Sequence, residues 1–390
     1  MMTPPANSSQ SSPSFSTVAS RSRGYVGEVV YIYAFDIAYD FERKPLRELL
    51  GQPVAQFSMD SSKRSPKHLF FYRPQMVRLT PLERIGPHGP VCVQRVVKIL
   101  PVGAVSITVH VPFAVDRVED LVEYHDLEFS NGVLQDKVRQ LAEEIRRELA
   151  PYLVKPVIDL SQEEAYTVFC MEPPTMGSLD GAPASAENWL LTNRREVAAL
   201  LTQEPDIAHL SNQEANESTH LYLSYYESDL VVVDWDAALI IDKPHNFEES
   251  LYIMEMANLQ LAELEAYDRM LDDALVRSYR DLSNRASRNR AEVLRELRDI
   301  RIDMARFNDE LSNITKFFGD WHLARIYENI SARFHLGDWH RSIDRKLKTL
   351  DDLYQILKHD QNNRWILMLE LTMVLLFVID LVFLFMGLKK

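Results

Sequence analysis

The chain has 390 residues, with 57 acidic against 43 basic side chains and a formal net charge of -14 at pH 7. This acidic balance argues against a surface that neutralises a phosphate backbone, so direct nucleic acid binding is not expected. A hydrophobic fraction of 46% predicts a folded body with a well-filled core. The two cysteines, Cys92 and Cys170, are too few for a disulfide framework and lack the spacing of a zinc or redox site.

The first 24 residues are rich in Ser and Pro and contain no apolar run of the kind that a secretory signal requires. We predict that residues 1–24 form a disordered tail. The alternative is an organelle transit peptide around Arg21 and Arg23. That alternative needs an amphipathic basic helix, which so much Pro and Ser disfavours.

Residues 25–243 alternate between strand-like and helix-like stretches, which predicts an α+β domain. Helices are expected at 43–50, 134–149 and 186–201. Strands are expected at 27–37, 68–79, 91–99, 102–111, 164–170, 220–226 and 230–241. The last two strands are predicted to form a hairpin through the polar turn at 227–229.

Known catalytic and cofactor motifs do not occur in this domain. It has no GxxxxGKS phosphate loop, no GxGxxG after a strand, no HExxH helix and no GxSxG elbow. Its histidines are scattered without ligand spacing. We therefore predict a protein that is not an enzyme, with no catalytic residue, cofactor or metal. The alternative, an enzyme in the α+β domain, requires a pocket with a strongly perturbed carboxylate or histidine.

Residues 244–363 carry helical patterns. Apolar residues between 293 and 318 recur in alternating steps of four and three, which is a heptad seam, with Leu297, Ile300, Met304, Phe307, Leu311 and Ile314 at its centre. The stretch at about 247–282 repeats these steps with Asp268 and Ser278 as polar members. We predict a coiled coil or a helical hairpin. Periodicity alone does not decide whether the seam is filled within one chain or between chains; we favour an intrachain hairpin that also stacks on neighbours.

Two copies of Gly-Asp-Trp-His occur 18 residues apart. They comprise Gly319, Asp320, Trp321 and His322, then Gly337, Asp338, Trp339 and His340. Each copy places Gly where one helix would end and Asp where the next would be capped, so the pattern favours helix capping. The alternative is a metal site built from the Asp and His side chains of both copies, with His335. A third helix is expected at 339–359.

Residues 365–388 form a long apolar stretch. As a helix with a rise of 1.5 Å per residue it reaches about 36 Å, enough to cross a hydrocarbon core of roughly 30 Å. Arg364 with Trp365, and Lys389 with Lys390, mark the two interfaces. We expect a tail-anchored, single-pass protein with its N-terminus in the cytoplasm, and a bacterial inner membrane is the simplest location.

Two acids interrupt this predicted span. Glu370 lies near one interface, whereas Asp380 lies past the midpoint of the span, where a lone acid costs about 2.5 to 3.5 kcal/mol. Because intramembrane acids usually face a bundle interior, we expect Asp380 to face other copies of the helix and to be protonated or hydrogen-bonded there. The alternative is a tolerated acid that is held neutral near lipid.

The C-terminal third resembles the family named for being required for meiotic nuclear division, over about 100 residues. The resemblance is carried by FFGDWHLARIY, by HRSIDRKLKTLDDLYQIL, by the Asn-rich step at 362–364 and by the acids Glu370 and Asp380, which keep the family's ten-residue spacing. Two features depart from the family. Its second acid is usually Glu, and its Trp at the membrane entry follows the first acid, whereas Trp365 precedes it. The N-terminal body matches only in outline, as in a divergent bacterial-type member.

The resemblance implies a membrane-bound oligomer without known catalysis, and mitochondrial members support the translation of inner-membrane proteins. The implied partners are further copies of this chain, membrane lipid and membrane-associated translation machinery. We therefore predict a non-enzymatic, oligomeric, tail-anchored scaffold. The alternative is an oligomeric ion channel or transport component with Asp380 facing the helix bundle. The expected division is a tail at 1–24, an α+β domain at 25–243, a helical coiled-coil region at 244–363 and a transmembrane anchor at 364–390.

Overall fold

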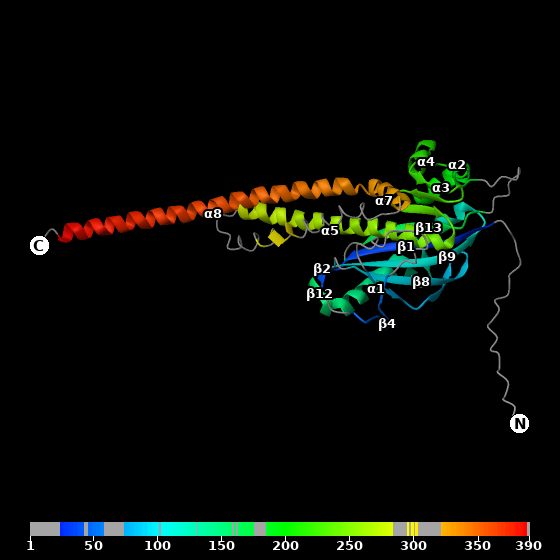
Figure 1. The fold of residues 1–390 in the computed structure, drawn as a ribbon, viewed down its shortest axis with the longest axis horizontal. Coiled ribbons are helices and arrows are strands. Elements are labelled where there is room, and N and C mark those ends of the chain that lie inside the picture. The colour runs from blue at the N-terminus through cyan, green and yellow to red at the C-terminus, as the bar shows by residue number, and fades with distance from the viewer. Residues whose placement is uncertain are drawn as a thin grey trace, which may run out of the picture.

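A computed structural model of the chain describes most of the body and the long helices. The described residues are 24–42, 46–57, 74–100, 103–130, 132–157, 160, 163–174, 185–283, 295, 298–299, 301–302 and 321–387. Figure 1 shows a sheet domain from which a long helical arm extends toward the C-terminus, with three short helices at the opposite end of the body.

Within these residues a ten-stranded sheet forms the body. Its order is β14-β15-β16-β13-β1-β9-β8-β6-β5, and β7 also pairs with β8. The β13–β16 pair is parallel and the other pairs are antiparallel. The strands are β1 (Tyr25–Asp36), β5 (Ala55–Gln56), β6 (Gln75–Arg78), β7 (Leu82–Gly86), β8 (Gly89–Ile99), β9 (Ala104–Val115), β13 (Glu164–Met171), β14 (Tyr222–Leu223), β15 (Leu230–Val233) and β16 (Ala237–Ile241).

The central strand β1 is buried on both faces. Because side chains alternate between the faces of a sheet, Tyr31 and Phe35 point into one core while Val30 and Ile32 point into the other. A strand that is covered on both sides needs apolar residues at nearly every position. The sequence YVGEVVYIYAFD meets that need from Val29 onward. The sheet therefore separates two hydrophobic cores.

Helices cover each face of this sheet. One face packs against α1 (Leu134–Leu149), α2 (Ala186–Thr192) and α3 (Arg194–Leu201), and the other packs against α5 (Phe247–Ser283), α7 (Trp321–Arg333) and the first part of α8 (Leu336–Gly387). Short elements complete the body: η1 (Val118–Tyr124), η2 (Ala150–Tyr152), η3 (Pro244–Asn246), α4 (Asn212–Thr219), and the pairs β2 (Ala38–Phe41) with β12 (Leu153–Pro156), β3 (Glu48–Leu49) with β4 (Gln52–Pro53), and β10 (Glu128–Phe129) with β11 (Gly132–Val133).

The helix α8 is 52 residues long and changes character along its length. Its first part packs on α5 and α7 through Ile343 and Leu350, which are almost fully buried. Its last part, Trp365–Gly387, has a mean hydropathy of 2.6 and is 0% buried, and it is long and apolar enough to cross a membrane. Figure 1 shows this part projecting beyond the end of α5.

The predicted organisation is confirmed at a coarse level, as a mixed α/β region followed by helices and one long apolar segment. The helix predicted at 134–149 coincides with α1. The helix predicted at 186–201 is divided at Asn193 into α2 and α3.

Two predicted elements are wrong. The described part of the expected helix at 43–50 forms β3 and a turn, with positive φ angles at Leu50 and Gly51. The strand expected at 230–241 turns back on itself, so that the Asp234 amide donates to the Ala237 carbonyl and β15 pairs with β16.

Gly27 of β1 marks a close approach of two strands. A Cβ atom added there would lie 1.9 Å from the Cys170 carbonyl oxygen and 2.9 Å from Cζ of Phe113. Because neither the β13 backbone nor a buried ring gives way cheaply, we expect Gly27→Ala to lower the free energy of unfolding by about 1 to 3 kcal/mol. Urea unfolding of the detergent-solubilised chain, followed by circular dichroism, measures this. The control is Gly86→Ala, whose Cβ meets Val91 at 3.4 Å; an equal loss in both variants would contradict the explanation.

Candidate functional site

Buried polar side chains concentrate on α5, the helix that lies between the sheet and α8. Its buried polar residues are Ser250, Glu255, Asn258, Gln260, Glu263 and Ser278. A buried charged or polar group costs free energy unless it is paired or hydrogen-bonded. The partners of these side chains therefore identify what α5 holds in place.

The best-buried ion pair joins α5 to the centre of the sheet. Lys98 of β8 donates from Nζ to Glu255, and the two side chains are 11% and 2% exposed. Ser106 of β9 donates to the other carboxylate oxygen of Glu255 at 2.6 Å. The Lys98 ammonium also lies 4.3 Å from the centroid of the Phe57 ring, a cation–π distance. Two strands and an aromatic ring thus fix the position of Glu255.

A second polar group lies further along α5, where β1 ends and β13 begins. Burial, the hydrogen bond that its protonated carboxyl donates to Glu265 and the charge of Glu265 raise the pKa of Glu164 to about 8, against the attraction of Arg269. Burial also raises the pKa of Asp36 to about 6, again opposed by Arg269. Asn258 donates to the Glu164 carbonyl at 3.0 Å. At neutral pH, Glu164 therefore retains a proton between β13 and α5.

The contacts of α5 continue from the sheet to α7 and α8. Tyr327 of α7 donates its hydroxyl to Gln260 at 2.6 Å. Lys346 of α8 lies 2.7 Å from a carboxylate oxygen of Asp268 and 2.7 Å from one of Asp272. One ammonium group therefore bridges two turns of α5, and α8 is attached to α5 by charge as well as by apolar packing.

The corner between α7 and α8 is attached to the body. Arg333 donates to the Glu217 carbonyl, and its Nε lies 3.5 Å from a carboxylate oxygen of Asp234. Phe334 packs edge-on against Tyr166 of β13, with ring centroids 5.1 Å apart. His335 then takes a left-handed conformation with φ of 49°, and α8 starts at the next residue. The beginning of the arm is therefore held against the sheet.

The structure places the second Gly-Asp-Trp-His copy differently from the prediction. Gly337 lies inside α8 and does not end α7, because His335 makes the left-handed turn. Asp338 lies in the first turn of α8, 3.3 Å from the His335 ring nitrogen, and it also pairs with Arg341. Trp339 packs against the core of the α5 face, and His340 follows it in the same turn.

Only part of the first copy is described. Gly319 and Asp320 lie outside the described residues. Trp321 begins α7 and is 79% exposed, and the His322 ring lies 5.7 Å from that of Tyr225. Among the residues that the structure describes, no group of three or more His, Cys, Asp or Glu side chains is arranged to hold a metal ion.

The heptad residues of α5 face the same chain. Leu264, Leu271 and Ser278 are 0% exposed, and the two leucines share a core with Ile343 and Leu350 of α8. The second set of seam residues, Leu297, Ile300, Met304, Phe307, Leu311 and Ile314, lies outside the described residues. Of their described neighbours, Asp299 lies 3.5 Å from Lys155, and Arg301 lies 3.2 Å from Asp351.

Glu370 and Asp380 lie on the projecting part of α8, where every described residue is exposed. The neighbours of Asp380 are also exposed: Ile379 is 42% and Leu381 is 40% exposed. Within a single chain, the described residues of the body therefore do not shield Asp380.

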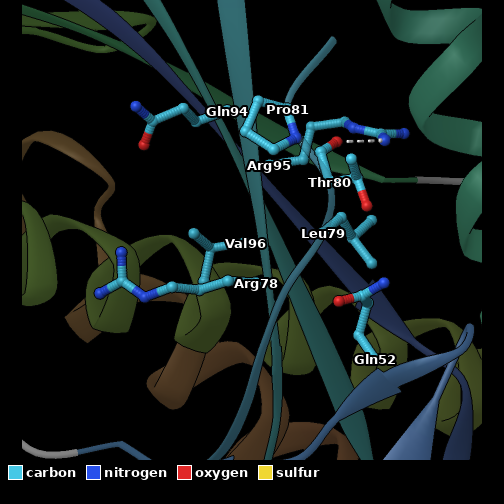
Figure 2. A pocket seen from close by; sticks show the side chains of 8 residues that line it. All are labelled: Gln52, Arg78, Leu79, Thr80, Pro81, Gln94, Arg95 and Val96. Atoms are coloured by element: carbon cyan, nitrogen blue, oxygen red, sulfur yellow. Dashed lines mark hydrogen bonds between the residues drawn. The ribbon is translucent and has the colours of Figure 1, made fainter. Parts of the chain in front are cut away.

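A pocket of about 370 Å³ opens where β6 gives way to β7, and Figure 2 shows its lining. It is lined by Gln52, Arg78, Leu79, Thr80, Pro81, Gln94, Arg95 and Val96. None of these is a carboxylate, a histidine or a cysteine, so the lining supplies no general acid–base pair and no base to activate the Thr80 hydroxyl. The strongly perturbed acids Asp36 and Glu164 adjoin Arg269 of α5 and do not line this pocket.

Comparison with known proteins identifies one family. The family described as "Uncharacterized protein MJ0711, N-terminal domain" matches residues 26–248, which include the sheet and the start of α5. The protein of that name from Methanocaldococcus jannaschii is 24% identical over 244 residues, covering 62% of this chain and 72% of the relative. No solved structure matches the chain. The resemblance to the meiotic nuclear division family lies mainly outside the matched residues and stays a prediction.

Sequence reasoning missed the polar contacts of α5. Lys98 and Glu255 are 157 residues apart, and nothing in a single sequence pairs them. One signal was present: α5 carries acids and amides inside an apolar run, LYIMEMANLQLAELEAY, on positions that an amphipathic helix would turn toward its core. A polar residue at such a position indicates a buried partner.

The Lys98–Glu255 pair makes a prediction about stability. Because Glu255→Gln leaves a buried ammonium without its counter-charge, we expect a loss of about 3 to 5 kcal/mol in the free energy of unfolding, and Lys98→Met a similar loss. The double variant Lys98→Met with Glu255→Leu should lose less than the sum. Urea unfolding measures all three. As the control, Glu119→Gln breaks the exposed pair with Arg117 and should cost only about 0 to 1 kcal/mol. Additive losses in the double variant would count against the pair.

The Glu164 carboxyl predicts a pH dependence. Its folded pKa of about 8 exceeds its usual 4.5, so the folded state binds this proton more tightly than the unfolded state. The resulting stabilisation is complete below the unfolded pKa and is lost as the pH rises toward 8. Asp36 acts in the same direction up to about pH 6. We expect the urea midpoint to fall between pH 5 and 8, and Glu164→Gln to flatten this slope, whereas Glu83→Gln on exposed β7 leaves it unchanged. A slope in Glu164→Gln equal to that of the wild type would refute the assignment.

Proposed function

Since the chain belongs to the family described as "Uncharacterized protein MJ0711, N-terminal domain", we propose that it is a non-enzymatic, oligomeric scaffold that is anchored in a membrane through α8 and presents this domain there.

The observation that carries the proposal is the continuity of α8. The same helix packs on the body at Ile343 and Leu350 and becomes the exposed apolar segment at Trp365. From Leu336 to Trp365 it spans about 43 Å at 1.5 Å per residue. An exposed apolar surface of this length is unfavourable in water and favourable in a bilayer. The helix would therefore set the distance between the sheet domain and the membrane.

The polar contacts of α5 support a rigid connection. Lys346 attaches α8 to Asp268 and Asp272, and Arg333 attaches the α7–α8 corner to Asp234. Arg333 precedes the first residue of α8 and Lys346 follows it, so a movement of α8 away from the body would break an ion pair. A movement of the body would then also move the membrane segment of α8, because the connection between them is rigid.

Asp380 supports an oligomer. An isolated acid near the bilayer midplane costs about 2.5 to 3.5 kcal/mol, and a cluster of helices that shields the acid from lipid lowers this cost. The heptad pattern predicted at 297–314 would extend the contact between copies outside the membrane. Cys92 is exposed and unpaired, which suits a reducing compartment, and we place the sheet domain in the cytoplasm. Membrane-associated translation machinery, the partner implied by the family resemblance, stays a prediction.

The scaffold predicts a specific effect of Asp380. We expect crosslinking in native membranes to give discrete multimers of the wild-type chain. Asp380→Leu should shift the detergent-extracted particle toward smaller mass, because no acid then has to be shielded from lipid by association. Val382→Leu, two residues away on the same exposed segment, is the matched control. A wild type that is strictly monomeric in both experiments would exclude the scaffold.

A channel is the second candidate, because several copies of α8 could place Asp380 around a polar path. Ion flux into vesicles that carry the wild type or Asp380→Leu separates the two functions. The scaffold predicts no flux in either case. Flux through the wild type that Asp380→Leu abolishes would replace the scaffold with the channel.

A further inference from the structure

The edge of the main sheet is interrupted beside β8. Arg78 at the end of β6 pairs with Val96, and Leu82 at the start of β7 pairs with Val93. The three residues between them leave this ladder, although the Leu79 amide still donates to the Arg95 carbonyl at 3.0 Å. Pro81 has no amide hydrogen to offer the ladder. The interruption opens the pocket of about 370 Å³.

Arg95, which lines this pocket, and Arg84 lie on the same face of the sheet. Arg84 pairs with Val91, and because side chains alternate along a strand, Val91 and Arg95 are on one face. Burial first, and then the charge of Arg84, lower the pKa of Arg95, so the two guanidinium groups repel each other. Figure 2 shows Arg95 directed to one side with Thr80, and Arg78 directed to the other.

The hydrogen-bonding capacity of Arg95 is incompletely used. Its Nη2 donates to the Thr80 carbonyl at 3.2 Å, whereas its Nε is shielded from solvent and has no hydrogen-bond partner among the described residues. A shielded donor on a charged group is costly when it has no acceptor. An acceptor placed at this nitrogen would remove that cost.

These arginines also lack a carboxylate partner. Within the described part of the chain, no ion pair involves Arg78, Arg84 or Arg95, and the charge of Glu144 on α1 acts on Arg95 without forming one. By contrast, Arg139 and Arg146 pair with glutamates at 2.7 and 2.9 Å. In a chain with 57 acids and 43 bases, it is unexpected that Arg78 and Arg95 line one pocket without an acid to pair with, and that the charge of Arg84 acts on Arg95, unless an anion from outside the chain neutralises them.

We propose that this pocket binds a phosphate group. The Arg95 guanidinium, which lines the pocket, and the neighbouring Arg84 guanidinium would supply the charge, and the Gln52 amide and the Thr80 hydroxyl would supply neutral hydrogen bonds. A dianion offsets two mutually repelling guanidinium groups better than a singly charged carboxylate does, and the planar guanidinium fits two phosphate oxygens at once. A pocket of this volume also has room for an organic group attached to the phosphate.

Calorimetric titration of the full chain in uncharged detergent at low salt tests the site. The probes are inorganic phosphate, glycerol 3-phosphate and citrate, with sodium chloride at matched ionic strength as the reference. We expect one of the two phosphate compounds to bind, and tighter binding of glycerol 3-phosphate would identify a phosphate ester as the ligand, whereas tighter binding of inorganic phosphate would identify the free ion. Binding of citrate alone, or of no probe at millimolar concentration, would overturn the proposal.

Variants assign the binding to the pocket. We expect Arg84→Gln and Arg95→Gln each to weaken phosphate binding about tenfold or more, because each removes a charge-assisted hydrogen bond. Arg117→Gln removes an exposed arginine that is paired with Glu119 and should bind as the wild type does. Since Arg84 lies on an edge strand, its variant remains informative if Arg95→Gln does not fold. Equal affinities in Arg84→Gln and Arg117→Gln would place the anion elsewhere. None of these outcomes depends on α8 or on oligomer formation.

Discussion

The arrangement of the chain depends on the burial of the Lys98–Glu255 ion pair between β8 and α5. A charge pair placed under a helix is stable in one geometry only, because a shift of the helix would leave both charges desolvated and apart. Ser106 also restrains Glu255, because its hydroxyl donates a hydrogen bond to the second carboxylate oxygen. We therefore expect the pair to favour one placement of α5 on the sheet more strongly than apolar packing alone would.

The rest of the helical region builds on that placement. Proceeding along α5, the polar contacts pass from the sheet at Glu255 and Asn258, through α7 at Gln260, to α8 at Asp268. The apolar residues between them join the sheet, α5, α7 and the first part of α8 into one core. The sheet domain and the first part of α8 are consequently one packed unit. The position of α5 on the sheet therefore sets the direction in which α8 projects.

Regular patterns in the sequence predicted the parts of this structure that depend on local residues. The amphipathic period of 134–149 predicts α1, and the apolar run at 27–37 predicts β1, because each pattern is read within one element. The turn at Asp234 was missed because it contains neither Gly nor Pro, and the residues on both sides of it are equally apolar. The contacts of Glu255, Lys346 and the pocket arginines join residues from different elements far apart in the chain, so no local pattern contains them.

The central claim is that α5 fixes the arm to the sheet domain, and a distance distribution tests it most directly. Spin labels at Glu83→Cys on β7 and Lys348→Cys on α8, in a chain with Cys92→Ser and Cys170→Ala, would be measured by pulsed electron spin resonance in membranes diluted with unlabelled protein. The account predicts one narrow distribution, which Glu255→Gln broadens. A broad distribution without that substitution, or a narrow one that Glu255→Gln leaves unchanged, would contradict it.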